Sequence, residues 1–72
     1  MDKRLLTAQQ LRLIIMLRHK RPVKSDLESY DRHEGRLWQW QVLSSEIIDI
    51  IILSNEYNMK ASDLREEIGM NS

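Results

Sequence analysis

The central stretch of the chain reads LWQWQVLSSEIIDIIIL, from Leu37 to Leu53. It holds both tryptophans and five isoleucines but only two charged residues, whereas 31% of the whole chain is charged. The alternation of Trp38, Trp40 and Val42 with polar residues is typical of a strand. The stretch contains neither Gly nor Pro, however, and it far exceeds the usual strand length. We therefore predict a helix, with a strand as the alternative for residues 36–43.

The apolar surface of this predicted helix is unusually wide. At 100° per residue Glu46, Asp49 and Glu56 fall on one side, and the isoleucines sweep an arc of about 200°. A chain of 72 residues offers one other long apolar helix to cover that arc, and small domains often gain stability by oligomerisation. We therefore predict self-association, as a homodimer or a larger assembly. The predicted self-interface or partner-interface residues are Trp38, Trp40, Ile47, Ile48, Ile51 and Ile52.

Composition narrows the class of protein. The chain has no cysteine, so neither disulfides nor thiolate metal sites can hold it together. The first ten residues contain no apolar segment typical of a secretory signal, and no apolar run approaches the length of a membrane span. We expect one small soluble domain over residues 1–72, located in the cytoplasm and without a cofactor, with residues 1–6 and 70–72 frayed.

The first helix has clear local signals at both ends. Thr7 and Gln10 have the spacing of a capping box, in which each side chain bonds the other residue's backbone amide. Pro22 stops the helix, because the residue before a proline disfavours helical dihedral angles. The sequence therefore predicts a helix that begins at Thr7 and ends just before Pro22.

Two short helices are predicted from similar signals. Ser25–Glu34 opens with a second capping-box pattern and is followed by Gly35, a residue suited to the left-handed position after a helix. Ser62–Ile68 opens with Ser-Asp as its cap and is followed by Gly69. Both segments therefore read as short capped helices.

The predicted fold is all-α, with two helical hairpins in the order long–short–long–short. The second long helix runs from Arg36 or Ser44 to Tyr57, and the two long helices pack together. An internal duplication would explain this order, because Val23–Leu27 aligns with Lys60–Leu64 at an offset of 37 residues. The simpler interpretation is that Ser-Asp-Leu is a common way to begin a helix, and we favour it.

Charge is divided unevenly along the chain. Residues 1–24 contain seven Lys or Arg and one acid, a net charge of +6, and residues 25–72 have a net charge of −6. Clustered cations are what phosphate binding requires. The competing interpretation, which we favour, is a cationic helix end at a solvated turn. The candidate nucleic-acid contacts are Arg18, Lys20, Arg21 and Lys24.

Part of the chain resembles a helix-turn-helix. Asn58–Met70 looks like the second helix of that motif, with Gly69 where the turn before the recognition helix begins. The recognition helix would have to start near Ser72. Leu11–Lys20 and Ser25–Glu34 resemble the first two helices of the same motif, but the helix after them is too apolar to face DNA. The resemblance implies DNA binding as an alternative function.

Other chemistry has little support in the sequence. His19 and His33 are the only imidazoles, and a metal site needs three or four convergent ligands. No arrangement typical of a nucleophile or a phosphate loop is present. Asp49 lies among isoleucines, where it either faces solvent or pairs with Arg12 or Arg18 of the same chain or of a second subunit.

The leading functional hypothesis is a small non-enzymatic regulator or adaptor that docks on another protein through helical surfaces. It rests on the small size, the lack of catalytic groups and the excess of apolar helical surface. A nucleic-acid-binding regulator that uses the basic residues around the end of the first helix is the alternative.

Overall fold

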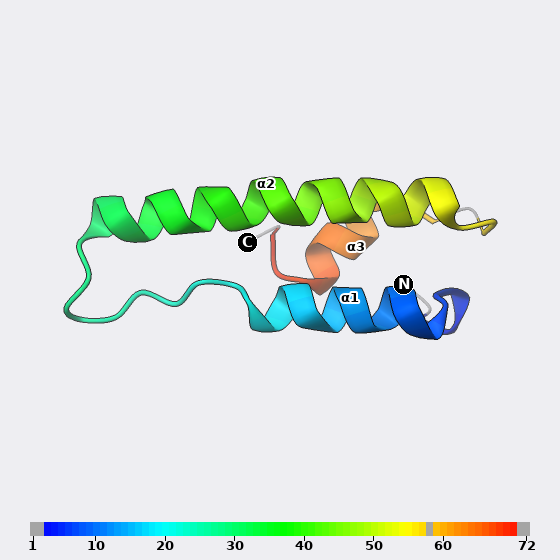
Figure 1. The fold of residues 1–72 in the computed structure, drawn as a ribbon, viewed down its shortest axis with the longest axis horizontal. Coiled ribbons are helices and arrows are strands. Elements are labelled where there is room, and N and C mark those ends of the chain that lie inside the picture. The colour runs from blue at the N-terminus through cyan, green and yellow to red at the C-terminus, as the bar shows by residue number, and fades with distance from the viewer. Residues whose placement is uncertain (1–2, 58, 71–72) are drawn as a thin grey trace.

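The structure is a computed structural model that describes residues 3–57 and 59–70. A short 3-10 helix, η1 (Lys3–Leu5), precedes three α-helices: α1 (Ala8–His19), α2 (Tyr30–Ser54) and α3 (Ala61–Glu67) (Figure 1). No strand is present among the described residues, so the predicted all-α class is confirmed. The predicted order of four helices is wrong, because the described chain has three α-helices.

The predicted start of α1 is confirmed, and its end lies two residues before the predicted one. Thr7 is the N-cap, and its hydroxyl accepts a hydrogen bond from the Gln10 amide at 3.1 Å. The Gln10 side-chain oxygen accepts in return from the Thr7 amide at 3.1 Å. The helix ends at His19, three residues before Pro22. Local sequence signals therefore suffice to place this element.

A single helix of 25 residues, α2, spans the central stretch. It includes residues 36–43, so the strand alternative is wrong. It also begins earlier than predicted, at Tyr30, where the Ser29 hydroxyl accepts from the Arg32 amide at 3.2 Å. The helix ends at Ser54 rather than at the predicted Tyr57.

The predicted short helix Ser25–Glu34 is wrong. Residues 20–29 form a loop, in which the Glu28 amide donates to the Ser25 carbonyl at 3.2 Å within a single turn. Leu27 is 100% exposed, so an apolar contact that could hold a separate helix here is lacking. Gly35 lies inside α2, where a Cβ would meet nothing within 4 Å. The segment therefore has helix-start chemistry but no core to pack on.

The side chain of Glu28 connects the loop to α2. Its carboxylate pairs with the guanidinium of Arg36 and lies 3.6 Å from Nδ1 of His33. His33 thus belongs to the first turn of α2. This contact holds the loop against the part of α2 that precedes the core.

The predicted short helix near the C-terminal end is confirmed with shifted boundaries. It is α3, Ala61–Glu67, one residue earlier than predicted at each end. Lys60 is the N-cap and makes no side-chain capping bond, so the predicted Ser62-Asp63 cap is wrong. Gly69 follows the helix as predicted and adopts the left-handed φ of +88°. The proposed duplication is not reflected in the fold, because residues 23–27 are loop and 61–64 are helix.

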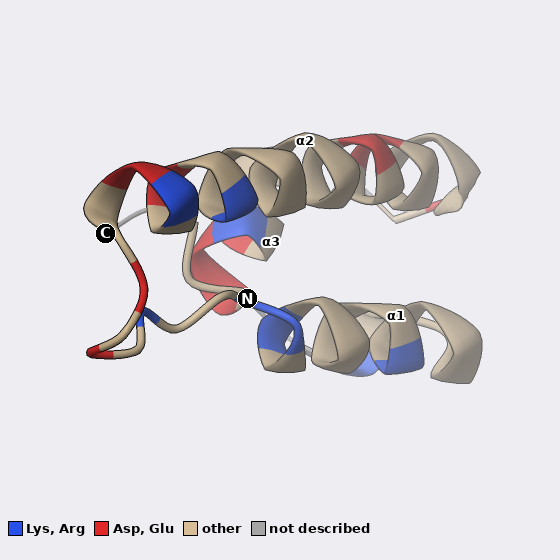
Figure 2. Cartoon of the chain, turned by 60° about the vertical axis from the view of Figure 1, so that its left-hand side comes forward, with Lys and Arg blue, Asp and Glu red and all other residues tan. Residues whose placement is uncertain are grey.

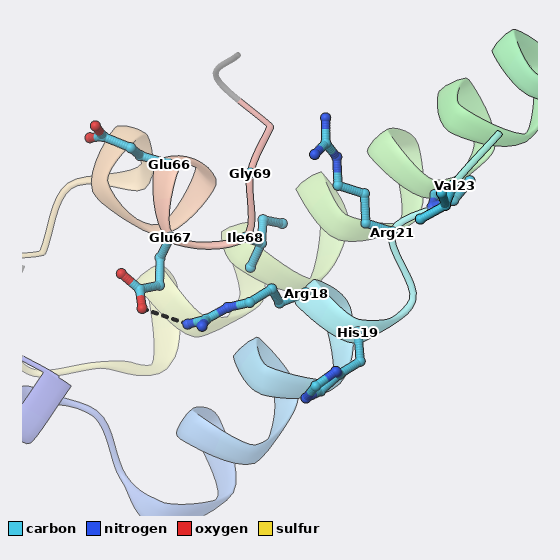
Figure 3. Close-up of a pocket in the computed structure, with 9 residues that line it drawn as sticks. Arg18, His19, Arg21, Val23, Glu66, Glu67, Ile68 and Gly69 are labelled. Carbon is cyan, nitrogen blue, oxygen red and sulfur yellow. Dashed lines mark hydrogen bonds and ion pairs between the residues drawn. The ribbon is translucent and has the colours of Figure 1, made fainter.

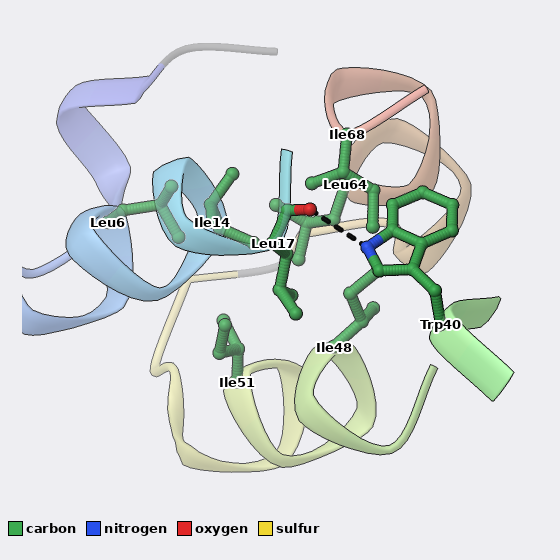
Figure 4. Packing of buried hydrophobic residues seen from close by; sticks show 8 residues of the cluster. All are labelled: Leu6, Ile14, Leu17, Trp40, Ile48, Ile51, Leu64 and Ile68. Atoms are coloured by element: carbon green, nitrogen blue, oxygen red, sulfur yellow. Dashed lines mark hydrogen bonds between the residues drawn. The ribbon is translucent and has the colours of Figure 1, made fainter. Parts of the chain in front are cut away.

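All three helices contribute to one core (Figure 4). The long helices α1 and α2 pack as predicted, and Trp40 of α2 donates its indole N–H to the Leu17 carbonyl of α1 at 2.9 Å. At the other end Gln10 bonds Ser54 at 3.3 Å and Asn55 at 2.9 Å. These contacts set the antiparallel alignment of α1 and α2. The core residues are Leu6, Ile14, Leu17, Trp40, Ile48, Ile51, Leu64 and Ile68.

Candidate protein-docking surfaces

The structure divides the six predicted interface residues into three groups by their exposure. Trp40, Ile48 and Ile51 are buried in the core of the single chain. Ile47 and Ile52 are half-buried and pack against that core, whereas Trp38 is 65% exposed. An external surface on α2 must therefore be built mainly from other residues. Those that sequence reasoning missed, all more than 40% exposed, are Val42, Leu43, Ile50 and Leu53.

Helix α3 lies between the two long helices in the view of Figure 2 and contacts both, so it covers one side of each. On α1 that side is marked by Arg18, which bonds Glu67 at 2.7 Å. On α2 it is marked by Ser45 and Asp49, which line a groove together with Met70. The opposite side of the α1–α2 pair is left without a covering helix among the described residues.

Five apolar side chains occupy that opposite side, which we name the hairpin face. Residues three, four and seven apart share one side of a helix, so Leu43, Ile47 and Ile50 form one row on α2. By the same spacing, Leu13 and Met16 share one side of α1, and the buried Ile14 and Leu17 lie between that side and Arg18. Leu13 and Met16 are half-buried, and they complete the face. The hairpin face consists of Leu13, Met16, Leu43, Ile47 and Ile50.

The hairpin face has opposite charges along its two long edges. On α1 the exposed Arg12 follows Met16 around the helix, away from α2. On α2 the exposed Glu46 occupies the equivalent outer position beside Ile50. Among the described residues, no charged one lies between these five, and the exposed Lys20, four residues after Met16, continues the α1 row at one end of the face. It is therefore an apolar strip with a basic edge and an acidic edge.

A second surface, the tryptophan groove, lies on the α3 side of α2. Its volume is about 440 Å³. Among the described residues that line it, the ionisable groups are the carboxylates of Glu46 and Asp49, and Trp38 is the largest apolar side chain. The groove therefore combines apolar contact with negative charge. Its lining residues are Trp38, Gln41, Val42, Ser45, Glu46, Asp49 and Met70.

The predicted nucleic-acid contacts lie around the C-terminal end of α1, beside a groove of about 650 Å³ (Figure 3). The structure brings Arg18 and Arg21 to this groove together with Glu66 and Glu67. The carboxylate of Glu67 neutralises Arg18 in the 2.7 Å ion pair.

The other two predicted contacts lie outside the lining of this groove. Lys20 is the C-cap residue of α1, and Lys24 donates to the Ser25 carbonyl at 3.3 Å. The region is thus of mixed charge and is not a continuous basic patch.

Asp49 is exposed on α2, so it faces solvent. Its predicted pair with Arg18 of the same chain is wrong, because Arg18 pairs with Glu67. The sequence signal that would have identified this pair is weak, since 49 residues separate its two members. Contacts between distant segments are set by the fold and not by local spacing.

In the described ranges 3–57 and 59–70, no three His, Asp or Glu side chains are placed to hold a metal ion. No helix in these ranges is both long and apolar enough to cross a membrane. Comparisons with protein-family models, with curated proteins and with solved structures found no match.

Proposed function

We propose that the chain is a non-enzymatic adaptor or small regulator that works by binding other proteins, and that its copies also associate with one another. One observation carries this proposal: α2 completes the core and still exposes Trp38, Val42, Leu43, Ile50 and Leu53. Each Å² of apolar surface removed from water contributes about 25 cal/mol. A partner that covers these side chains therefore gains binding free energy from apolar surface that is exposed to solvent in the single chain.

The tryptophan groove is the proposed docking site for a foreign partner. Its acids, Glu46 and Asp49, favour cationic side chains, and the lining residues that the structure describes include no Lys or Arg. A Lys or Arg placed over the indole of Trp38 would add a cation–π attraction. We therefore propose an amphipathic helix with Lys or Arg beside its apolar residues as the partner segment.

The substitution Trp38→Ala tests this site, and Tyr30→Ala is its matched control on the same helix. Trp38 is 65% exposed inside the groove and Tyr30 is 66% exposed outside it. The probe is a synthetic amphipathic helix of Leu and Lys, and a Leu and Glu helix of equal length is the charge control. Binding is measured by calorimetry, and circular dichroism checks that both variants keep their helices.

We expect Trp38→Ala to weaken binding of the Leu and Lys helix by roughly 30-fold, since a hot-spot aromatic contributes about 2 kcal/mol. Tyr30→Ala should bind as the unchanged protein does. Equal binding by both variants, or equal binding of the acidic helix, would contradict the proposed site.

The nucleic-acid function stays a prediction. The ion pair between Arg18 and Glu67 and the presence of Glu66 in the same groove give it no specific support. Its test is binding of duplex DNA or RNA at rising salt, because affinity built on phosphate contacts falls steeply as salt rises. Charge reversal at Lys20 and Arg21 should abolish such binding.

A further inference from the structure

We infer that the hairpin face is covered by the hairpin face of a second copy, with α1 of each copy lying over α2 of the other. The two helical pairs then form a four-helix bundle, with one α3 on each outer side. This inference rests on the proposed self-association. It adds the surface that is used, the orientation of the copies and the side chains that select that orientation.

The hairpin face is continuous across the two helices. Gln10 bonds Ser54 and Leu17 bonds Trp40, so the segment of α1 between these contacts runs beside the segment of α2 between them. Leu13 and Met16 lie in this segment of α1. Leu43, Ile47 and Ile50 lie in the segment of α2 beside it. The result is one uncharged surface two helices wide, which is the shape that packs face to face in helical bundles.

The charges on the edges favour a second copy as the occupant. An isologous interface brings the same surface of both copies together, so the surface must complement itself. The hairpin face meets this condition, because its α1 edge carries Arg12 and its α2 edge carries Glu46. Each copy therefore supplies the charge that the other copy needs.

The same charges decide between the two symmetric orientations. If like helices stack, Glu46 lies near Glu46 of the other copy and Arg12 near its own equivalent, and like charges in an interface oppose association. If α1 lies over α2 of the other copy, Arg12 meets Glu46 twice, once at each edge. The second orientation replaces two repulsions by two ion pairs.

The levels of the two residues along the bundle agree with this orientation. Arg12 lies between Gln10 and Leu17, so its level falls within the segment of α2 between Trp40 and Ser54, which contains Glu46. A two-fold axis parallel to the helices keeps every residue at its level. Arg12 of one copy therefore lies within about two helical turns of Glu46 of the other along the axis, a separation that the two long side chains together can span.

Sedimentation equilibrium over a range of concentrations tests the surface and the orientation separately. Ile50→Asp places a charge inside the face and should abolish association while circular dichroism shows retained helices. Glu34→Arg makes the same charge change as Glu46→Arg at an exposed site on α2 away from the face, and it should leave association unchanged. It is the matched control.

The orientation is tested by charge reversal. Arg12→Glu and Glu46→Arg should each weaken the dimer about tenfold, and the double variant should restore it. An equimolar mixture of the two single variants should form mixed dimers in preference to either self-pair, because each reversed side chain then meets an opposite charge.

Each negative result overturns a different part of the inference. A folded monomer at every concentration would overturn the self-association and this inference together. A dimer that tolerates Ile50→Asp would overturn the choice of surface, while the self-association would survive. Preferential pairing of the unchanged protein with Glu46→Arg would show that like helices face each other, and it would overturn the orientation alone.

Discussion

Two segments of the chain share the letters Ser-Asp-Leu and end in different structures. Ser62–Leu64 lies in the first turn of α3, whereas Ser25–Leu27 lies in the loop before α2. Leu64 is fully buried beneath the two long helices, and Leu27 is fully exposed. Capping chemistry alone does not sustain a helix of two turns, since isolated short helices are marginal in water. Burial of one leucine distinguishes the two segments.

The glycine that follows each segment differs in the same way. Gly69 adopts φ +88° at the end of α3, and Gly35 continues as an ordinary helical residue of α2. A glycine permits a left-handed turn but does not require one. The chain turns at Gly69 because α3 has reached the edge of the core, and no such edge exists at Gly35.

The largest effect is expected from Leu64→Ala. Removing a fully buried leucine costs about 2–5 kcal/mol, which is comparable with the whole stability of a domain of this size. We expect loss of α3 and a much lower urea midpoint, measured by circular dichroism. A loss under about 1 kcal/mol would mean that burial does not distinguish the two Ser-Asp-Leu segments.

A smaller loss is expected from Gly69→Ala. The left-handed conformation costs a residue with a side chain about 1–2 kcal/mol, and the nearest atom to a new Cβ, on Arg21, lies at an ordinary 3.6 Å. Backbone strain and not crowding therefore sets the cost, which urea unfolding measures. An unchanged midpoint would show that α3 ends without needing this turn.

Gly35→Ala should have the opposite sign. Alanine is favoured over glycine inside a helix by about 1 kcal/mol, and a Cβ at this position meets nothing within 4 Å. We expect a higher unfolding midpoint. A decrease in stability would indicate that Gly35 ends a helix, as its sequence context first suggested.

The smallest effect is expected from Leu27→Ala, because an exposed surface substitution usually changes stability by less than about 0.5 kcal/mol. Differential scanning calorimetry beside Leu64→Ala gives the direct contrast between the two segments. A clear loss of stability would mean that Leu27 has a partner in solution, and a concentration-dependent loss would place that partner on a second copy.

Much of the fold was predictable because it depends on neighbours within four residues. Nearby residues alone determine the capping box of Thr7, the end of α1 before Pro22 and the left-handed conformation of Gly69. The helical periodicity of the central stretch likewise outweighed its short strand-like alternation. The short helix after Pro22 was predicted from the same signals and is absent, because those signals do not report burial.

The candidate surfaces were predictable only in part. The width of the apolar arc indicated that α2 has more than one contact side, and Trp38 of the predicted interface set is exposed in the structure. Which isoleucines remain exposed depends on where α3 packs, and that contact joins segments far apart in the chain. The sequence shows the helical spacing of Leu43 and Ile50, but it does not show that these two side chains are exposed.

By itself the sequence determined the helical class, the ends of α1 and the turn after α3, since caps, prolines and glycines act on the backbone beside them. Only the tertiary structure decided that Trp40 is core while Trp38 is surface, and that one side of the α1–α2 pair stays uncovered. Two tryptophans two residues apart point to different sides of one helix. Their environments are set by the helices packed against each side, which local spacing does not encode.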